Sequence, residues 1–182
     1  MPDEMVIRHC APTLASIKTG SLFSCPCETE KEVLSSVREL NRRLGCKGLR
    51  VMPLRRRDGK YLVYVYRPEK LARDLSDEHA RSILAELDYP GGNPCGCLKH
   101  LRERLRTSKE FPHEIGLFLG YPPEDVEGFM GKQEEAKCVG CWKVYGDEVR
   151  ARRLFMQYEH CTSIYLRQYA QGKGIERLTV AV

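Results

Sequence analysis

Apolar residues between positions 33 and 44 recur at spacings of four, three and four, which places them on one face of a helix. Thr29 precedes this run and Glu32 follows three residues later, in the order of a capping box. Gly45 stands where the pattern stops and is typical of a helix end. The sequence therefore predicts an amphipathic helix between Thr29 and Gly45 that packs against a core.

Extended segments are expected on both sides of this helix. Residues 21–24 form a short apolar run, and 49–54 and 61–66 alternate and are rich in β-branched and aromatic residues. Asp58-Gly59 lies between the last two segments and is a preferred hairpin turn. A strand, a helix and a hairpin in this order favour a small mixed sheet with helices on one face.

The remainder of the chain is mainly helical in its spacing. The expected elements are a short helix over residues 12–18, helices beginning at Ser76 or Asp77, Asn93-Pro94, Phe111-Pro112 and Pro123, a short strand over 142–145, a long helix including 151–169, and a final strand over 178–182. We expect one α+β domain over residues 1–182, with a sheet of three to four strands covered by about six helices.

Composition narrows the class of protein. The 182 residues are 42% hydrophobic and 30% charged, as in ordinary globular domains. No run approaches the roughly 20 apolar residues of a membrane span, and the acidic start at Asp3 and Glu4 is unlike a signal peptide. We therefore expect a cytoplasmic protein with no membrane segment. The net charge of +5 is mild and interspersed with acidic residues, which gives little support for a nucleic-acid partner.

The chain is cysteine-rich, with nine cysteines. An odd number cannot pair completely within the chain, and cytoplasmic thiols stay reduced, so metal ligands, redox groups or buried thiols are expected. Cys95-Gly96-Cys97 falls at a predicted helix start, where backbone amides favour a thiolate. The pair can form an easily reduced disulfide, bind a soft metal together with His100, or be two ordinary thiols.

A second cysteine motif, Cys138-Val139-Gly140-Cys141, has the spacing of a metal knuckle. A tetrahedral site needs a second pair, for which Cys25 and Cys27 or the pair at 95 and 97 are candidates. Zinc or iron is the expected metal, and an iron–sulfur cluster is the weaker alternative. The plain alternative is a turn that happens to hold two cysteines. Cys161 lies beside the apolar stripe of the long helix and is expected to be a buried small hydrophobe.

Several segments carry a resemblance to a known family. The most specific is Phe111-Pro112-His113-Glu114-Ile115-Gly116-Leu117-Phe118-Leu119-Gly120-Tyr121-Pro122, accompanied by residues 9–15, Lys18, 22–23, 64–67, 124–126, 140–145 and 161–162. Together they resemble the bacterial domain-of-unknown-function family 3793, uncharacterised proteins of anaerobic bacteria. The resemblance implies no activity. Its members occur near flavodoxin-like or iron-transport genes, which implies redox or metal physiology and a flavodoxin-like or other redox protein as partner.

His9-Cys10 and His113-Glu114 lie in these segments and form another candidate site. A His beside a Cys can activate the thiol as a nucleophile, and the same residue types can ligate a metal. We predict that the segment around Cys10 packs against residues 111–121. Cys10 would be nucleophile or ligand and His113 base or second ligand. Glu114 would orient His113, and Lys18 or Arg67 would hold an anionic substrate. The plain alternatives are a buried thiol and a helix-start histidine.

The sequence leaves three functions open. The leading expectation is a cytoplasmic metal-binding or redox-active thiol protein. One alternative is a small enzyme built on Cys10 and His113. The other is a basic adaptor that binds nucleic acid or an acidic protein through Arg55-Arg56-Arg57 at the hairpin tip. A further group of basic residues is expected to form a solvated helix face: Lys99, Arg102, Arg104 and Arg106.

Overall fold

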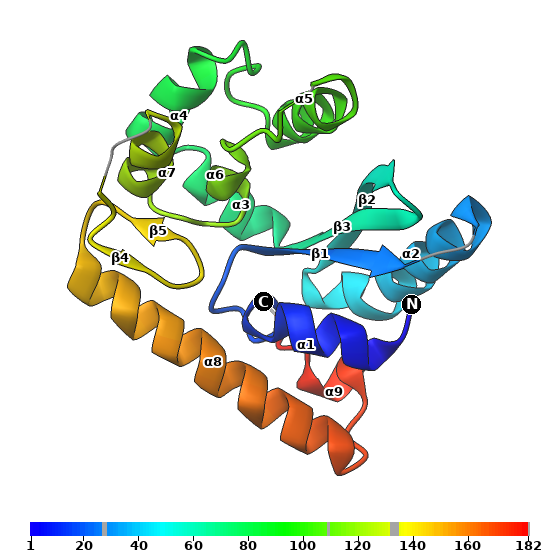
Figure 1. Cartoon of the computed structure of the whole chain (residues 1–182). Coiled ribbons are helices and arrows are strands. Elements are labelled where there is room, and N and C mark those ends of the chain that lie inside the picture. The colour runs from blue at the N-terminus through cyan, green and yellow to red at the C-terminus, as the bar shows by residue number, and fades with distance from the viewer. Residues whose placement is uncertain (27–28, 109, 132–134, 182) are drawn as a thin grey trace. The chain divides into compact units, whose positions relative to one another are not determined.

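The computed structural model describes residues 1–26, 29–108, 110–131 and 135–181 (Figure 1). The chain divides into two compact units: unit 1 comprises Met1–Glu69 and Tyr158–Val182, and unit 2 comprises Lys70–Gln157. The single domain expected from the sequence stays a prediction. Helices and two small sheets confirm the predicted α+β class.

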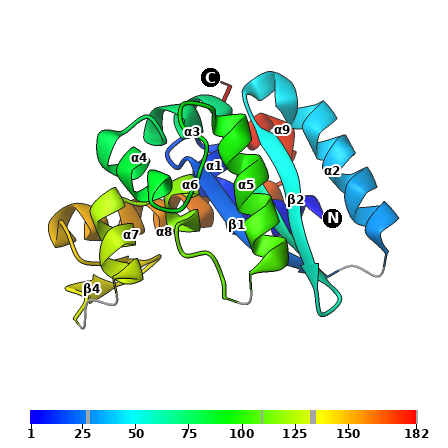
Figure 2. The same ribbon diagram turned by 90° about the horizontal axis from the view of Figure 1, so that it is seen from above.

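Unit 1 contains a three-stranded sheet in the order β1-β3-β2, formed by β1 (Gly20–Pro26), β2 (Arg50–Arg57) and β3 (Lys60–Tyr66). All three predicted strands form, and their pairings are antiparallel where a mixed sheet was expected. Asp58 and Gly59 close the β2–β3 hairpin (Figure 2) with φ angles of 49° and 69°. Positive φ at both positions is the requirement of the turn that Asp-Gly predicts.

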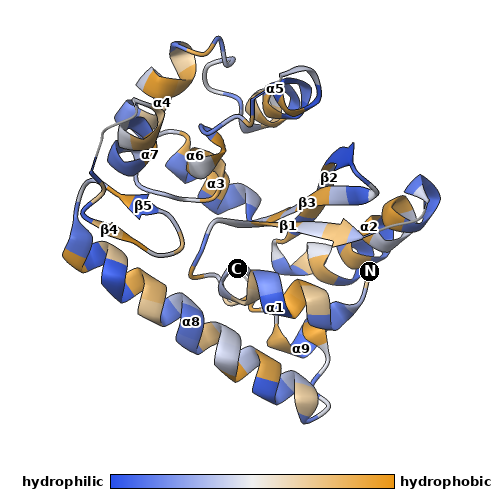
Figure 3. Cartoon of the chain, viewed as in Figure 1, coloured by the Kyte–Doolittle hydropathy of each residue, from blue (hydrophilic) through white to orange (hydrophobic). Residues whose placement is uncertain are grey.

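The core of unit 1 lies between one face of this sheet and the helices α1 (Asp3–Leu14), α2 (Glu30–Leu44) and α9 (Ile175–Leu178). Figure 3 shows apolar residues along the strands and hydrophilic ones at the hairpin end. Buried core residues come from every one of these elements: Val6, Ile7, Leu14, Phe23, Val33, Val37, Leu40, Leu44, Val51, Val63, Val65, Ile175 and Leu178. Thr29 Oγ1 accepts a hydrogen bond from the Glu32 amide, which confirms the predicted start of α2.

Two predicted elements of unit 1 were wrong. Residues 12–18 are not a helix of their own, because α1 begins at Asp3 and already ends at Leu14, with Pro12 inside it. The acidic pair at its first turn suits a helix N-terminus. The expected strand at the C-terminus is instead the short α9, and the described residues 179–181 form no strand. The Val180 amide donates to the Leu14 carbonyl, a tertiary bond that local pattern does not reveal.

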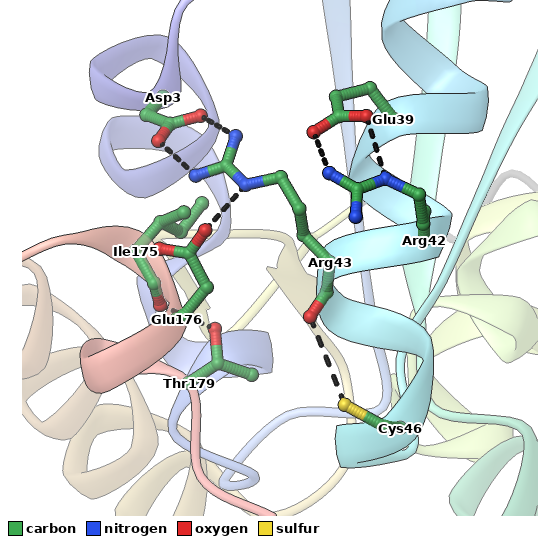
Figure 4. Close-up of polar contacts among 8 residues, drawn as sticks. All are labelled: Asp3, Glu39, Arg42, Arg43, Cys46, Ile175, Glu176 and Thr179. Atoms are coloured by element: carbon green, nitrogen blue, oxygen red, sulfur yellow. Dashed lines mark hydrogen bonds and ion pairs between the residues drawn. The ribbon is translucent and has the colours of Figure 1, made fainter.

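An ion cluster ties the two ends of the chain into unit 1 (Figure 4). Arg43 on α2 donates to both carboxylate oxygens of Asp3 on α1, at 3.0 and 2.7 Å, and to Glu176 on α9. The bond from Arg43 lowers the pKa of Glu176, and the two carboxylates raise the pKa of Arg43. Asp3 and Glu176, near the two ends of the chain, are therefore joined through one guanidinium group.

Unit 2 is built mainly from short helices. After α3 (Pro68–Asp74), which enters it from unit 1, come α4 (Glu78–Ala85), α5 (Pro94–Thr107), α6 (Ile115–Phe118), α7 (Pro123–Met130), β4 (Cys138–Val139) and β5 (Lys143–Val144). The long α8 (Glu148–Ala170) then runs from unit 2 into unit 1. Helix α7 contacts α4, α6 and β5.

Local capping explains where these helices start. Asp77 accepts a hydrogen bond from the Ala80 amide at α4, and Asn93 accepts one from the Cys95 amide at α5, as predicted. Strand β5 confirms the extended segment expected over 142–145. Among the helices formed by the described residues, none combines the length and apolar character needed to cross a membrane.

Candidate functional site

The segment 111–114 at the start of the family-like motif alternates between exposed and buried residues. Phe111 and His113 face solvent, whereas Pro112 and Glu114 are buried ahead of α6. The motif therefore presents its histidine at the surface and carries its carboxylate inside unit 2.

Glu114 is 2% exposed, and its Oε1 atom accepts two hydrogen bonds. Tyr89, after α4, donates its hydroxyl at 2.8 Å, and Arg104, on α5, donates Nε at 2.7 Å. Burial, together with the nearby carboxylate, raises the pKa of Tyr89, so the phenol remains a donor. Glu114 was predicted to orient His113, and its partners here are instead Tyr89 and Arg104. The carboxylate holds the ends of α4 and α5 against the motif.

A pocket of about 850 Å³ lies beside this network, and we call it the motif pocket. Its apolar wall is formed by Leu87, Phe111, Pro112, Phe129 and Met130. Its polar lining residues are Arg104, Ser108, Glu110, His113, Glu114, Lys143 and Tyr145. All of these residues belong to unit 2. An apolar wall with a few convergent polar groups is the usual make-up of a small-molecule site.

Phe129 on α7 positions two of the polar groups. The ring of His113 meets the Phe129 ring edge-on, with centroids 4.8 Å apart. The Nζ atom of Lys143 lies 5.4 Å from the centre of the same ring. A cation over an aromatic face is attracted by the ring quadrupole. One apolar side chain therefore keeps an imidazole and an ammonium group at the pocket.

The strand that carries Lys143 is braced by a second buried carboxylate. Asp125 on α7 is 2% exposed and accepts hydrogen bonds of 2.7 Å from Trp142 Nε1 and from the amides of Tyr145 and Gly146. A Cβ atom at Gly128 would lie 2.7 Å from the Tyr145 ring, so glycine is needed for this close packing. Sequence reasoning missed Lys143 and Tyr145, although both lie in a segment that resembles the family.

The N-terminal candidates occupy different surroundings in unit 1. Cys10 is fully buried within α1, and burial raises its pKa. A nucleophilic thiolate needs the opposite shift. His9 is exposed and stacks on Phe23 with ring centroids 5.3 Å apart. The Nζ atom of Lys18 lies 5.6 Å from the centre of the Tyr158 ring.

Arg67, the other candidate for holding an anion, is 2% exposed and directs its guanidinium group at backbone carbonyls. The acceptors are the carbonyl oxygens of Thr13, Leu14, Lys47 and Val180. These bonds give Arg67 a structural task within unit 1. Cys10 and His113 belong to different units, so their pairing stays a prediction.

The paired cysteines lie in unlike positions. Cys95 is exposed, whereas Cys97 is buried and its Sγ donates to the Pro90 carbonyl at 3.2 Å. Residues two apart on a helix do not face each other, and His100 packs against Tyr89. In the β4–β5 hairpin Cys138 is buried and Cys141 is exposed.

Cys25 is buried in β1, and Cys27 lies outside the described residues. Over the described ranges, no three His, Cys, Asp or Glu side chains are grouped to hold a metal ion. Zinc or iron binding stays a prediction that metal analysis of the purified protein would test.

The rate at which each cysteine is alkylated should follow its exposure to solvent. We expect iodoacetamide at pH 8 to modify the exposed Cys46, Cys95 and Cys141 within minutes. Cys161 should react far more slowly, because burial raises its pKa to about 11 and only about one thiol in a thousand is ionised at pH 8. Cys10 should react only in denaturant. Mass spectrometry of tryptic peptides at timed quenches would measure the order, and rapid native labelling of Cys10 would contradict it.

Comparison with known proteins identifies a family but no individual relative. No curated protein and no solved structure matches this chain. A family model described as "Protein of unknown function (DUF3793)" matches residues 6–179. The matched range contains every residue that forms the motif pocket, together with the Glu114 and Asp125 networks that hold it. The chain belongs to the DUF3793 family of proteins of unknown function.

Proposed function

We propose that unit 2 binds a small organic acid with an apolar part in the motif pocket. The observation that carries this proposal is the joint placement of His113 and Lys143 on Phe129, beside the apolar wall of a pocket of about 850 Å³. Pockets of roughly 300–1,000 Å³ with this mixture of surfaces are typical of small-molecule sites.

The charges lining the pocket favour an acidic ligand. Glu114 already compensates Arg104 through a short ion pair, so Lys143 supplies the cationic contact. His113, which contacts the same Phe129 ring, adds a second donor to the pocket lining. Glu110 also lines the pocket, and its carboxylate opposes an anion. The apolar wall would take the hydrocarbon part of the ligand, and the ammonium group of Lys143 would bind its carboxylate.

The affinity of a panel of aromatic and branched aliphatic carboxylates would be measured by isothermal titration, and the tightest ligand kept for variants. Lys143→Gln is expected to weaken its binding about ten-fold, the loss of one charge-assisted hydrogen bond. Glu110→Gln should leave binding unchanged or strengthen it, because it removes a repulsive charge.

Lys99→Gln is the matched control, since Lys99 is an exposed lysine of unit 2 that does not line the pocket. Equal losses for Lys99→Gln and Lys143→Gln would mean that only net charge matters. Failure of every acid in the panel to bind would refute the proposal. The matching amines, tested in parallel, should bind more weakly than the acids.

The thiol activities form separate proposals. Metal binding, redox exchange and an enzyme based on Cys10 and His113 rest on the cysteine pattern and not on the motif pocket. Metal analysis and the alkylation order given above test them without reference to ligand binding.

A further inference from the structure

A second cluster of polar groups lies in unit 1, at the closed end of the β2–β3 hairpin. The strand register puts Ser24, Leu62 and Arg55 in one row across the sheet, and Lys60 opposite Arg57. Directly paired residues share a face, and residues two apart on a strand do so as well. The register therefore gathers three cations and a hydroxyl on one face of the hairpin end.

This face is hollowed. A pocket of about 270 Å³ is lined by Ser24, Arg55, Arg57, Asp58, Lys60 and Leu62. Figure 3 shows the same end of the hairpin as hydrophilic, in contrast to the apolar strands that lead to it. The pocket lies wholly within unit 1, so it is independent of the motif pocket.

Arg56 points to the other face. It pairs with Tyr61, and its guanidinium carbon lies 6.0 Å from the centre of the Tyr61 ring. Tyr61 is buried in the core of unit 1, which identifies this as the core-facing side of the sheet. The three consecutive arginines are therefore divided between the two faces, and only Arg55 and Arg57 line the pocket.

We propose that this pocket binds a phosphate monoester, or inorganic phosphate, as a dianion. Among the described residues, its lining holds three cations and one carboxylate, that of Asp58, and this excess of basic groups suits a dianion. The ion pair between Arg57 and Asp58 is 3.4 Å long, and both side chains are well exposed, so it competes weakly with a ligand. Guanidinium groups bind phosphate oxygens with paired donors, and Ser24 offers a neutral donor beside them.

The compact grouping favours a single phosphate group over a nucleic-acid strand. A strand is tracked by cations spread along a groove, with aromatic side chains on which its bases stack. Here the cations surround one small hollow, and its apolar lining residue is the aliphatic Leu62. Four ligands therefore distinguish the alternatives: inorganic phosphate, phenyl phosphate, phenyl sulfate and a single-stranded oligothymidylate.

The test is titration of the full chain, followed by amide chemical shifts, at constant ionic strength. Phenyl phosphate should shift the amides of residues 55–62 saturably, and its affinity should rise from pH 5.5 to pH 7.5 as the monoester, with a second pKa of about 6, becomes a dianion. Phenyl sulfate, which stays a monoanion, should bind at least five-fold more weakly.

Variants separate the pocket from general charge. Arg55→Gln and Arg57→Gln should each weaken phenyl phosphate binding about five-fold or more, whereas Arg56→Gln, the matched control one residue away, should change it less than two-fold. Equal losses in all three variants would overturn the proposal. So would binding of the oligothymidylate with a steep salt dependence when neither phosphate ligand binds, because that result identifies a nucleic-acid surface.

Discussion

Arg67→Met should lower the free energy of unfolding of the protein by about 4 kcal/mol, because several hydrogen bonds from a charged donor are lost at once. Arg67 is 2% exposed and donates to four backbone carbonyls that belong to separate parts of unit 1: Thr13 and Leu14 at the end of α1, Lys47 before β2, and Val180 near the C-terminus. Methionine fills similar space but offers no donor.

Urea unfolding followed by far-ultraviolet circular dichroism would measure the loss. Arg67→Lys should recover part of it, since an ammonium group can serve some of the same acceptors but lacks the planar fork of arginine. Arg42→Met is the control, because Arg42 is exposed and pairs with Glu39 at the surface, where an ion pair contributes about 1 kcal/mol or less. Equal destabilisation by Arg67→Met and Arg42→Met would show that the bonds from Arg67 to the backbone carbonyls stabilise the fold no more than a surface ion pair does.

Asp125→Ala is expected to have a comparable effect, about 3–4 kcal/mol, by releasing the β5 segment of unit 2. The change removes the acceptor for Trp142 Nε1 and for the Tyr145 and Gly146 amides, all at 2.7 Å. Asp125→Asn should destabilise the protein less than Asp125→Ala does. Its amide oxygen can still accept hydrogen bonds, although its NH₂ group then faces a donor.

Trp142 reports this change directly, because it is the chain's single tryptophan and is 8% exposed. Its fluorescence should shift to the red in Asp125→Ala at denaturant concentrations where the wild type is native. Asp147→Ala is the control, since Asp147 is an exposed aspartate that accepts from one amide, Arg150 N, and its loss should cost about 1 kcal/mol. An unshifted spectrum and wild-type stability for Asp125→Ala would show that the hydrogen bonds to Asp125 are not needed to hold the β5 segment in place.

The two networks also connect stability to the proposed ligand. Asp125 fixes the strand that carries Lys143 and the adjoining Tyr145, and Glu114 fixes Arg104, another residue that lines the motif pocket. Asp125→Asn, measured below its unfolding transition, should therefore weaken organic-acid binding without removing any lining residue. That outcome would show that the affinity depends on the position of the lining residues as well as on their direct contacts with the ligand.

Local chemistry determined much of the fold from the sequence. Thr29, Asp77 and Asn93 start helices because a capping side chain needs only amides two or three residues away. Asp58-Gly59 sets the hairpin because its turn needs positive φ at two adjacent positions. The pairing of the strands next to the turn follows from it, since the turn fixes which residues of β2 and β3 face each other as far as the register shift between Pro53 and Arg55.

Long-range contacts decided the rest. The C-terminal segment became α9 and an irregular end because Val180 bonds to Leu14 and Arg67, neither of which is near it in sequence. The sequence singled out His113 and Glu114 but could not tell that one faces solvent and the other is buried, because their neighbours Tyr89, Arg104 and Phe129 come from three separate helical regions. A pocket is a property of side chains brought together by packing, and only the tertiary structure places Lys143 beside His113.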